Sequence, residues 1–176
     1  YGDDDWSSKS GKEADLELLE RGKKFTPASV DFSKISFETR DGTALGYPDD
    51  SFDFAWSLSS IEHFGGHDAA LQALLEMGRV VKPGGIIAVA TEYLLLEEHS
   101  HPEYFTRSQI LEELIAPASS TMTLVGDVNF DTLTYEYLVD SVTMPAGLNR
   151  QRRHVVLNDG NTQWTSIMLF FRKKDR

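Results

Sequence analysis

Two apolar runs with a helical stripe between them constrain the fold more than any other feature of the sequence. The run FDFAWSL, residues 52–58, is followed by DAALQALLEMGRVV, whose leucines recur at helical spacing behind Asp68, the N-cap candidate. KPGG then stops the helix, since proline cannot continue it and the glycines allow a tight reversal. The next run, IIAVAT at residues 86–91, is apolar throughout, as parallel strands buried on both faces are. This order predicts a strand, a helix and a second, parallel strand.

The alternation of helix and strand begins upstream of this unit. Ser10, with Glu13 three positions on, forms a capping box and predicts a helix from about Gly11 to Lys23. The stretch KISFETR alternates apolar and polar residues and predicts a strand at residues 35–39 that runs into Asp41.

Downstream, a second capping box opens another helix. In TRSQILEELIAP, Thr106 and Gln109 supply the box, and Pro117 is expected to stop the helix just before it. Strands are predicted at TMTLVGDV and TQWTSIMLFFRK, residues 121–128 and 162–173. The segment between them is irregular, with short strands expected at LTYEYLV and HVVL.

Strands and helices in alternation, followed by two terminal strands, predict the α/β class with an open sheet and helices on both faces. The length is ordinary for one hydrophobic core, so residues 1–176 are interpreted as a single domain. Open sheets of this kind bind ligands at the carboxyl ends of their strands. Asp41 and residues 57–60 fall at two such ends.

The formal net charge of −11 argues against a polyanionic partner, because phosphate backbones are bound mainly by clustered lysine and arginine. Nucleic acid is therefore not an expected partner. Residues 150–176 are the basic exception, with seven lysines and arginines against two aspartates. An anionic ligand is one interpretation of that tail, and a solvated strand end with loop charges is the favoured one.

The chain shows no sign of a membrane or secretory segment. No apolar run approaches the roughly 20 residues that a spanning helix needs. The N-terminal YGDDDWSSKSGK is acidic where a signal peptide is basic and then apolar. Without cysteine the sequence has no disulfide or thiolate ligand. We expect a cytoplasmic protein with no membrane partner.

Histidine spacing does not predict a metal site. His63 and His67 have helical i, i+4 spacing, but two glycines lie between them and no third ligand is evident. His99 and His101 flank a serine in an acidic loop that offers no further support. No metal is expected.

The ordered motifs of residues 35–91 resemble the middle of the class I, Rossmann-like, S-adenosylmethionine-dependent methyltransferases that act mostly on small molecules. The stretch RDGTALGYPDDSFDFAWSLSSIEHF has an acidic residue after a strand, a loop, a strand and the EH start of a helix. LLEMGRVVKPGGIIAVAT follows in order and at the usual spacing. The resemblance implies a Rossmann-like sheet, S-adenosylmethionine as cofactor, S-adenosylhomocysteine as product and a small-molecule acceptor.

The resemblance also implies a cofactor site. The Asp41 carboxylate would accept the adenine exocyclic amine, which suits a largely buried N–H donor because a charged acceptor makes the stronger bond. Backbone amides of Gly42 and Thr43 would lie near the ring, with apolar contact from the two residues that follow, Ala44 and Leu45. Ser57 and Leu58 would contact the methionine part. Taken alone, each residue also fits a plain turn or polar loop.

Glu62 and His63 are the catalytic candidates by the same resemblance. They lie at a helix start that faces the site in this family. His63 is suited to take a proton from a hydroxyl or amine as the methyl group arrives. The alternative is a packing role, because proximity alone supplies much of the rate in methyl transfer. Tyr93, after IIAVAT, is the candidate substrate contact.

The sequence departs from the family at its N-terminal end. The family begins with a strand, a glycine-rich loop of the ExGxGxG kind, a helix and a second strand, and no such glycine pattern precedes Ile35. The expected fold is therefore incomplete, without the first strand, helix and second strand. Asp3, Asp4 and Asp5 lie near the place of the ribose-binding acid, but the role is not carried over.

The missing strands have a consequence for the sheet. They would separate the strand before Asp41 from the strand that ends at Leu58, which leaves a gap of about 14 Å at ordinary strand spacing. Either the missing elements belong to a longer native protein, or residues 35–39 pair differently, or another chain fills or covers the exposed edge. We expect self-association, with a homo-oligomer formed through the incomplete sheet edge.

Two functional hypotheses follow. The first is a methyltransferase of which this sequence is a fragment, with S-adenosylmethionine as donor and an unidentified small-molecule acceptor, based on the ordered motifs. The second is a methyltransferase-like domain that binds no cofactor and serves as an interaction or structural module, based on the missing glycine loop. A nicotinamide-dependent dehydrogenase is disfavoured, since it needs the same phosphate-binding turn.

Overall fold

The protein is described by a computed structural model that divides into two compact units, Tyr1–Asp41 and Gly42–Arg176. The structure describes residues 23–25, 27, 31–36, 38–131, 139–141, 156–158 and 161–175. Each unit is considered by itself. The single domain expected from the sequence stays a prediction.

The first unit contains two short 3-10 helices, η1 (Lys23–Phe25) and η2 (Phe32–Lys34). Asp31 caps η2, because its Oδ1 accepts a hydrogen bond from the Ser33 amide at 3.1 Å. The helix predicted over residues 11–23 lies outside the described residues except for its last position. The strand predicted at residues 35–39 is wrong, since its described residues are not in a strand. No strand is described within this unit that could pair with it.

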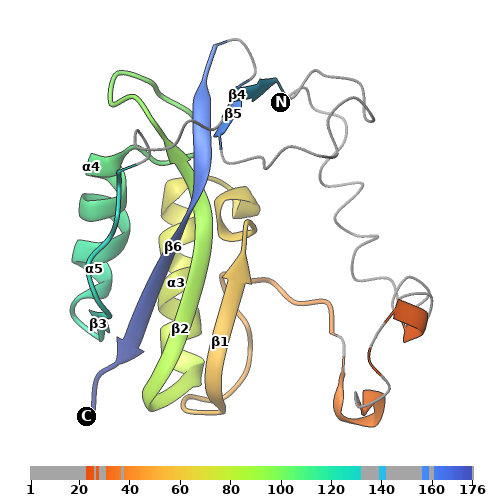
Figure 1. Cartoon of the computed structure of the whole chain (residues 1–176). Coiled ribbons are helices and arrows are strands. Elements are labelled where there is room, and N and C mark those ends of the chain that lie inside the picture. Colours follow the sequence, from red (N-terminus) through yellow and green to blue (C-terminus); the bar gives the residue numbers. More distant parts are fainter. Residues whose placement is uncertain are drawn as a thin grey trace. The chain divides into compact units, whose positions relative to one another are not determined.

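The second unit is built on a mixed, open sheet in the order β1-β2-β6-β5-β4, with β3 paired to β6 (Figure 1). The predicted strand at residues 52–58 is confirmed, and it pairs parallel to the next strand as expected. The last strand pairs antiparallel with the second. The strands are β1 (Phe52–Leu58), β2 (Val81–Leu94), β3 (Met122–Leu124), β4 (Val139–Ser141), β5 (Val156–Asn158) and β6 (Gln163–Lys173).

Helix α3 (His67–Val80) joins β1 to β2 and confirms the predicted strand–helix–strand unit. Its predicted cap is wrong, because the N-cap is Gly66, at φ 93° and without a side-chain cap bond. The left-handed backbone at this position suits glycine. Asp68 lies instead in the first helical turn, where a negative charge is favourable near the free amides.

The second predicted helix is confirmed with its cap. The Gln109 amide donates to Thr106 Oγ1 at 3.3 Å, and Gln109 Oε1 accepts from the Thr106 amide at 2.9 Å. The helix continues as α4 (Arg107–Gln109), the π-helical η4 (Ile110–Ile115) and α5 (Ala116–Ala118). The expected stop before Pro117 is wrong, because the π turn ends there and proline occupies the first turn of α5.

Within the second unit, α3 and η4 pack together against the sheet, and the hydrophobic core lies between them and the strands. Strands β2 and β6 supply its sheet side, and α3 and η4 supply its helix side. Burying each large apolar side chain stabilises the fold by roughly 1.5–3 kcal/mol. The fully or almost fully buried residues on these elements include Leu74, Ile87, Val89, Ile110, Leu114, Leu169 and Phe171.

Two side chains of α3 fix the loop that leads into β1. Arg79 donates from Nε and Nη2 to the two carboxylate oxygens of Glu76, each at 2.8 Å, and from Nη1 to the Tyr47 carbonyl at 2.8 Å. Glu76 Oε2 also accepts the Leu45 amide at 3.1 Å. The hydrogen bonds from Arg79 hold the pKa of Glu76 below its ordinary value of 4.5. This pair ties residues 45–47 to the helix that carries the core.

Glu76→Ala should lower the free energy of unfolding by about 1–3 kcal/mol near neutral pH, since it removes the charged hydrogen bonds from Arg79 and the acceptor of the Leu45 amide. A carboxyl group whose folded pKa is depressed contributes its stability above its unfolded pKa, and that contribution is lost as the pH falls through the folded value. The difference between the two proteins should therefore shrink below pH 4.5. Urea unfolding near neutral pH and at about pH 3 measures it. Glu112→Ala, at an exposed site on η4, is the matched control, and equal losses at both sites would contradict the assignment.

The opposite face of the sheet carries exposed apolar side chains. On β1, Phe54, Trp56 and Leu58 are 56%, 64% and 57% exposed. Trp56 lies beside Ala88 of β2 in the sheet, and Ala88 lies beside Phe170 of β6, which is 43% exposed. The apolar strip therefore crosses three strands and ends at β1, the terminal strand of the order.

An exposed apolar edge strand is a template for pairing with another chain, so the expectation of self-association stands as a prediction. Trp56→Lys should shift the protein toward monomer, because a charge on the strip opposes burial. Sedimentation equilibrium over a range of concentrations is the measurement. Leu111→Lys, at a 38% exposed position on η4, is the control. A wild-type protein that stays monomeric throughout would sink the prediction.

Candidate functional site

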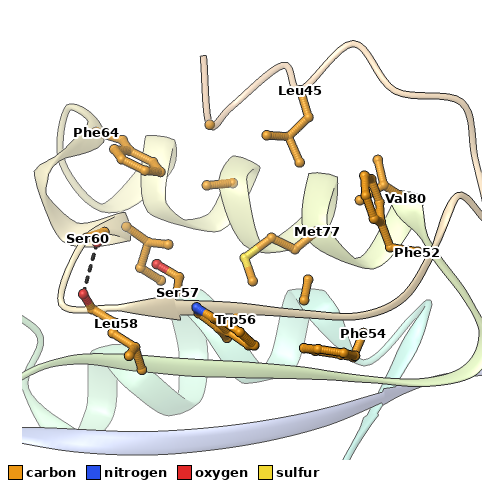
Figure 2. Close-up of a pocket in the computed structure, with 14 residues that line it drawn as sticks. Leu45, Phe52, Phe54, Trp56, Ser57, Leu58, Ser60, Phe64, Met77 and Val80 are labelled. Carbon is orange, nitrogen blue, oxygen red and sulfur yellow. Dashed lines mark hydrogen bonds between the residues drawn. The ribbon is translucent and has the colours of Figure 1, made fainter. Parts of the chain in front are cut away.

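A cavity of about 590 Å³ runs along β1 between that strand, the loop after Gly42, the 3-10 helix η3 (Ile61–Phe64) and α3 (Figure 2). Residues from both sides of β1 line it, so it wraps the edge of the terminal strand. The lining is mostly apolar and includes Phe52, Met77 and Val80. Its size falls within the range of small-molecule sites.

Four of the predicted cofactor residues line this one cavity: Gly42, Leu45, Ser57 and Leu58. The Phe64 ring packs so closely on Gly42 that a Cβ there would lie 2.3 Å from the ring carbon Cε2. Thr43 and Ala44 follow in the same loop but are not among the lining residues. Asp41 is the last residue of the first unit, so its position relative to the cavity is not described.

Ser57 supplies the clearest polar signal in the cavity. It projects from β1 toward α3, whereas Phe54 and Trp56 project from the other side of the strand (Figure 2). The Ser57 Oγ atom is buried and has no hydrogen-bond partner among the described residues. Buried polar atoms are rarely left unpaired. An unpaired hydroxyl in a cavity wall indicates a place for a polar ligand atom.

The turn after β1 has unusual geometry. Ser59 adopts φ 46°, a left-handed conformation that is uncommon for residues other than glycine. Its amide donates to the Ala90 carbonyl at 2.9 Å, and the Ser60 hydroxyl donates to the Leu58 carbonyl at 2.9 Å (Figure 2). These bonds hold the chain reversal at the carboxyl end of β1, where open α/β sheets bind ligands.

The catalytic candidates lie on η3 but do not line the cavity. Ile61 and Phe64 of this short helix face the cavity, while Glu62 and His63 belong to a separate polar cluster. The Glu62 side chain is completely buried, and its Oε2 accepts from Thr91 Oγ1 at 3.1 Å. Burial raises the pKa of the Glu62 carboxyl group. A buried carboxyl with a shifted pKa is a candidate for proton chemistry.

His63 lies between two carboxylates. Its Nδ1 is 3.1 Å from Glu103 Oε2, and its Nε2 is 3.8 Å from Glu62 Oε1. Tyr93, the candidate substrate contact, is 6% exposed and meets the Phe130 ring edge-on within the core, and burial raises its pKa. The structure thus groups Glu62 with His63 and places Tyr93 among core residues.

Sequence reasoning missed three residues that shape the site: Glu76, Arg79 and Glu103. Each of them has a partner about 30 to 40 positions away in the chain: Leu45 for Glu76, Tyr47 for Arg79 and His63 for Glu103. Local spacing therefore gave no signal for these contacts. Glu76 and Arg79 do fall in the LLEMGRVVKPGG motif. The motif was recognised, but the sequence did not indicate what these two side chains bind.

His67 has a structural position. Its Nδ1 lies 2.7 Å from Glu113 Oε2, its Nε2 lies 3.0 Å from the Tyr104 carbonyl, and its ring stacks on Phe105. Among the residues that the structure describes, no group of three or more His, Cys, Asp or Glu side chains is placed to hold a metal ion. No helix in the described part of the chain combines the length and apolarity that crossing a bilayer requires.

Comparison with known proteins gives a family match. Residues 11–89 match the family described as methyltransferase domain. The "Probable methyltransferase ltbC" of Aspergillus luteorubrus is 30% identical over 118 residues, which cover 67% of this chain and 39% of that protein. The 2-methyl-6-phytyl-1,4-hydroquinone methyltransferase of Synechocystis sp. is 33% identical over 99 residues, covering 56% and 29%. The chain thus spans well under half the length of these curated relatives.

The fold has a matching solved structure. A SAM-dependent methyltransferase of Methanosarcina mazei aligns with a TM-score of 0.51 over 92% of this chain and 79% of that one, at 13% identity. At that identity the likeness concerns the fold, and it confirms the predicted Rossmann-like α/β class. The chain is therefore similar in sequence to the methyltransferase domain family over residues 11–89, and it shares the Rossmann-like α/β fold of the Methanosarcina mazei protein.

Proposed function

We propose that the chain binds S-adenosylmethionine along β1 and takes part in methyl transfer to a small-molecule acceptor. The observation that carries the proposal is the cavity that brings together Gly42, Leu45, Ser57 and Leu58, residues from two separate stretches of the sequence. Its apolar lining suits an adenine ring, and the unpaired Ser57 hydroxyl suits a polar atom of the cofactor. Ser57 and Leu58 lie at the carboxyl end of β1, the end at which such sheets bind ligands.

Each residue has a role in this proposal. The Asp41 carboxylate accepts the adenine amine, and the Gly42 and Thr43 amides lie near the ring. Leu45, with Ala44 beside it, gives apolar contact. Ser57 and Leu58 hold the methionine part. When bound, S-adenosylmethionine supplies a methyl group activated by its sulfonium.

The polar cluster on η3 would manage the proton. His63 takes the proton that the acceptor's hydroxyl or amine must lose. Glu62, buried 3.8 Å from His63 Nε2, stabilises the positive charge that the ring then carries. Tyr93 would contact the substrate through its phenol hydroxyl, because its ring packs in the hydrophobic core.

The relatives support a small-molecule acceptor. The Synechocystis protein is named for a hydroquinone substrate. We expect the methyl acceptor of this chain to be a small molecule as well, and we expect no nucleic-acid partner.

The alternative remains a methyltransferase-like domain that binds no cofactor and serves as an interaction module. One sequence observation favours it, because no glycine-rich loop precedes Ile35. Such loops let the backbone approach a cofactor closely. The two functions differ in whether this 176-residue chain binds S-adenosylhomocysteine.

Calorimetric titration with S-adenosylhomocysteine should therefore give saturable heat. Asp41→Ala should weaken the affinity roughly 10- to 100-fold, since a charged hydrogen bond contributes about 1.5–3 kcal/mol. Ser57→Ala should weaken it less, by about 3- to 10-fold, because a neutral bond contributes about 0.5–1.5 kcal/mol.

Glu112→Ala, exposed on η4 and outside the cavity lining, is the control and should bind as wild type does. Absence of heat from a folded wild-type sample would favour the interaction module. Binding that is unaffected by Ser57→Ala would reject this cavity as the site.

A further inference from the structure

A series of polar side-chain contacts passes through η3, the short helix that also lines the cavity. Thr91 Oγ1 donates to Glu62 Oε2 at 3.1 Å, and Glu62 Oε1 lies 3.8 Å from His63 Nε2. On the other side of the ring, Nδ1 lies 3.1 Å from Glu103 Oε2. Glu62 Oε1 is buried without a hydrogen-bond partner among the described residues. The imidazole therefore connects a buried carboxyl group to a carboxylate that reaches solvent, since the Glu103 side chain is 29% exposed.

The backbone around Glu103 is held on both sides. His101 Nδ1 accepts the amides of Glu103 and Tyr104, at 3.2 and 3.1 Å. Next along the chain, the Phe105 amide donates to the Glu92 carbonyl at 3.0 Å, and its carbonyl accepts from the Leu94 amide at 2.8 Å. These backbone hydrogen bonds anchor the segment to the end of β2, and the Glu103 carboxylate thereby lies next to His63.

The contact with Glu103 has a consequence for the tautomer of His63. A carboxylate can only accept hydrogen bonds. The nitrogen that faces it must therefore carry the hydrogen, which is Nδ1. In a neutral imidazole the other nitrogen, Nε2, then holds the lone pair.

We propose that Glu103 is the positioning residue of His63, and that it fixes the Nδ1–H tautomer so that Nε2 is the nitrogen that accepts the acceptor's proton. The inference rests on the proposed function and narrows it to acceptors that react through an O–H or N–H group. In the step assigned to His63, that bond breaks, its electron pair stays on the acceptor oxygen or nitrogen, and the proton moves to Nε2. The resulting imidazolium lies between Glu103 and Glu62.

His67 provides an internal reference. It also has a glutamate at Nδ1, but its Nε2 faces the Tyr104 carbonyl. Neither of its ring nitrogens is hydrogen-bonded to the Glu103 side chain. Its ring signals should stay unchanged when Glu103 is replaced, and they report that the fold is intact.

The test is nitrogen-15 NMR of the histidine rings in the full chain at about pH 8, above the ordinary titration range of imidazole. His63→Asn assigns the His63 signals by their disappearance. In the wild type, the hydrogen of His63 should lie on Nδ1. In Glu103→Ala that preference should be lost, with the hydrogen moving toward Nε2, while the His67 signals stay in place.

Glu98→Ala is the matched control, because Glu98 is an exposed glutamate five residues away in the same segment. It should leave the His63 tautomer unchanged. An unchanged tautomer in Glu103→Ala, or the same change in both variants, overturns the inference.

The readout does not depend on methyl transfer, so the two proposals fail separately. Loss of the Nδ1–H preference in a protein that gives no heat with S-adenosylhomocysteine would reject the cofactor site and support the positioning contact. Saturable binding with an unchanged His63 tautomer in Glu103→Ala would support the cofactor site and reject the role of Glu103.

Discussion

Burial of one face of β2 is the constraint on which the rest of the second unit depends. This strand is hydrogen-bonded to β1 on one side and to β6 on the other, so it fixes the direction and register of both. Its core-facing side chains, Ile87 and Val89, are fully buried against α3 and η4. In the sequence, α3 lies between β1 and β2, so the packing of this helix also sets where β1 ends and β2 begins. The cavity runs along β1, and the polar cluster lies on η3, which follows that strand.

The 3-10 helix η3 links the two halves of the site. Four consecutive residues turn through it, so Ile61 and Phe64 face the cavity while Glu62 and His63 face Thr91 and Glu103. A completely buried carboxyl group such as Glu62 is unfavourable for stability unless it is well paired. Its second oxygen has no partner in the described structure. Stability alone does not account for a glutamate there, whereas proton chemistry at His63 does.

Strongly periodic stretches were predicted well. The bounds of β1 match the run FDFAWSL, and the Thr106 and Gln109 capping box forms as expected, because these features depend on neighbours in sequence. The errors occur where context overrides a local signal. A glycine with left-handed backbone, not Asp68, caps α3, and Pro117 is accommodated because a π-helical turn precedes it. The strand expected at residues 35–39 has no described partner in its own unit, and an isolated strand cannot satisfy its backbone groups.

For the site, the contributions of pattern and packing separate clearly. The resemblance of the ordered motifs to a known family was enough to nominate Gly42, Leu45, Ser57 and Leu58, because motif order can be recognised in the sequence alone. Glu103 could not be nominated in this way, since 40 residues separate it from His63 and only the packing of the 101–105 segment against β2 brings them together. The same holds for the Leu45 amide and Glu76, which are 31 residues apart. The fold class follows from periodicity and the candidate residues from the resemblance in motif order, whereas hydrogen-bond partners depend on distances in space that only the folded core establishes.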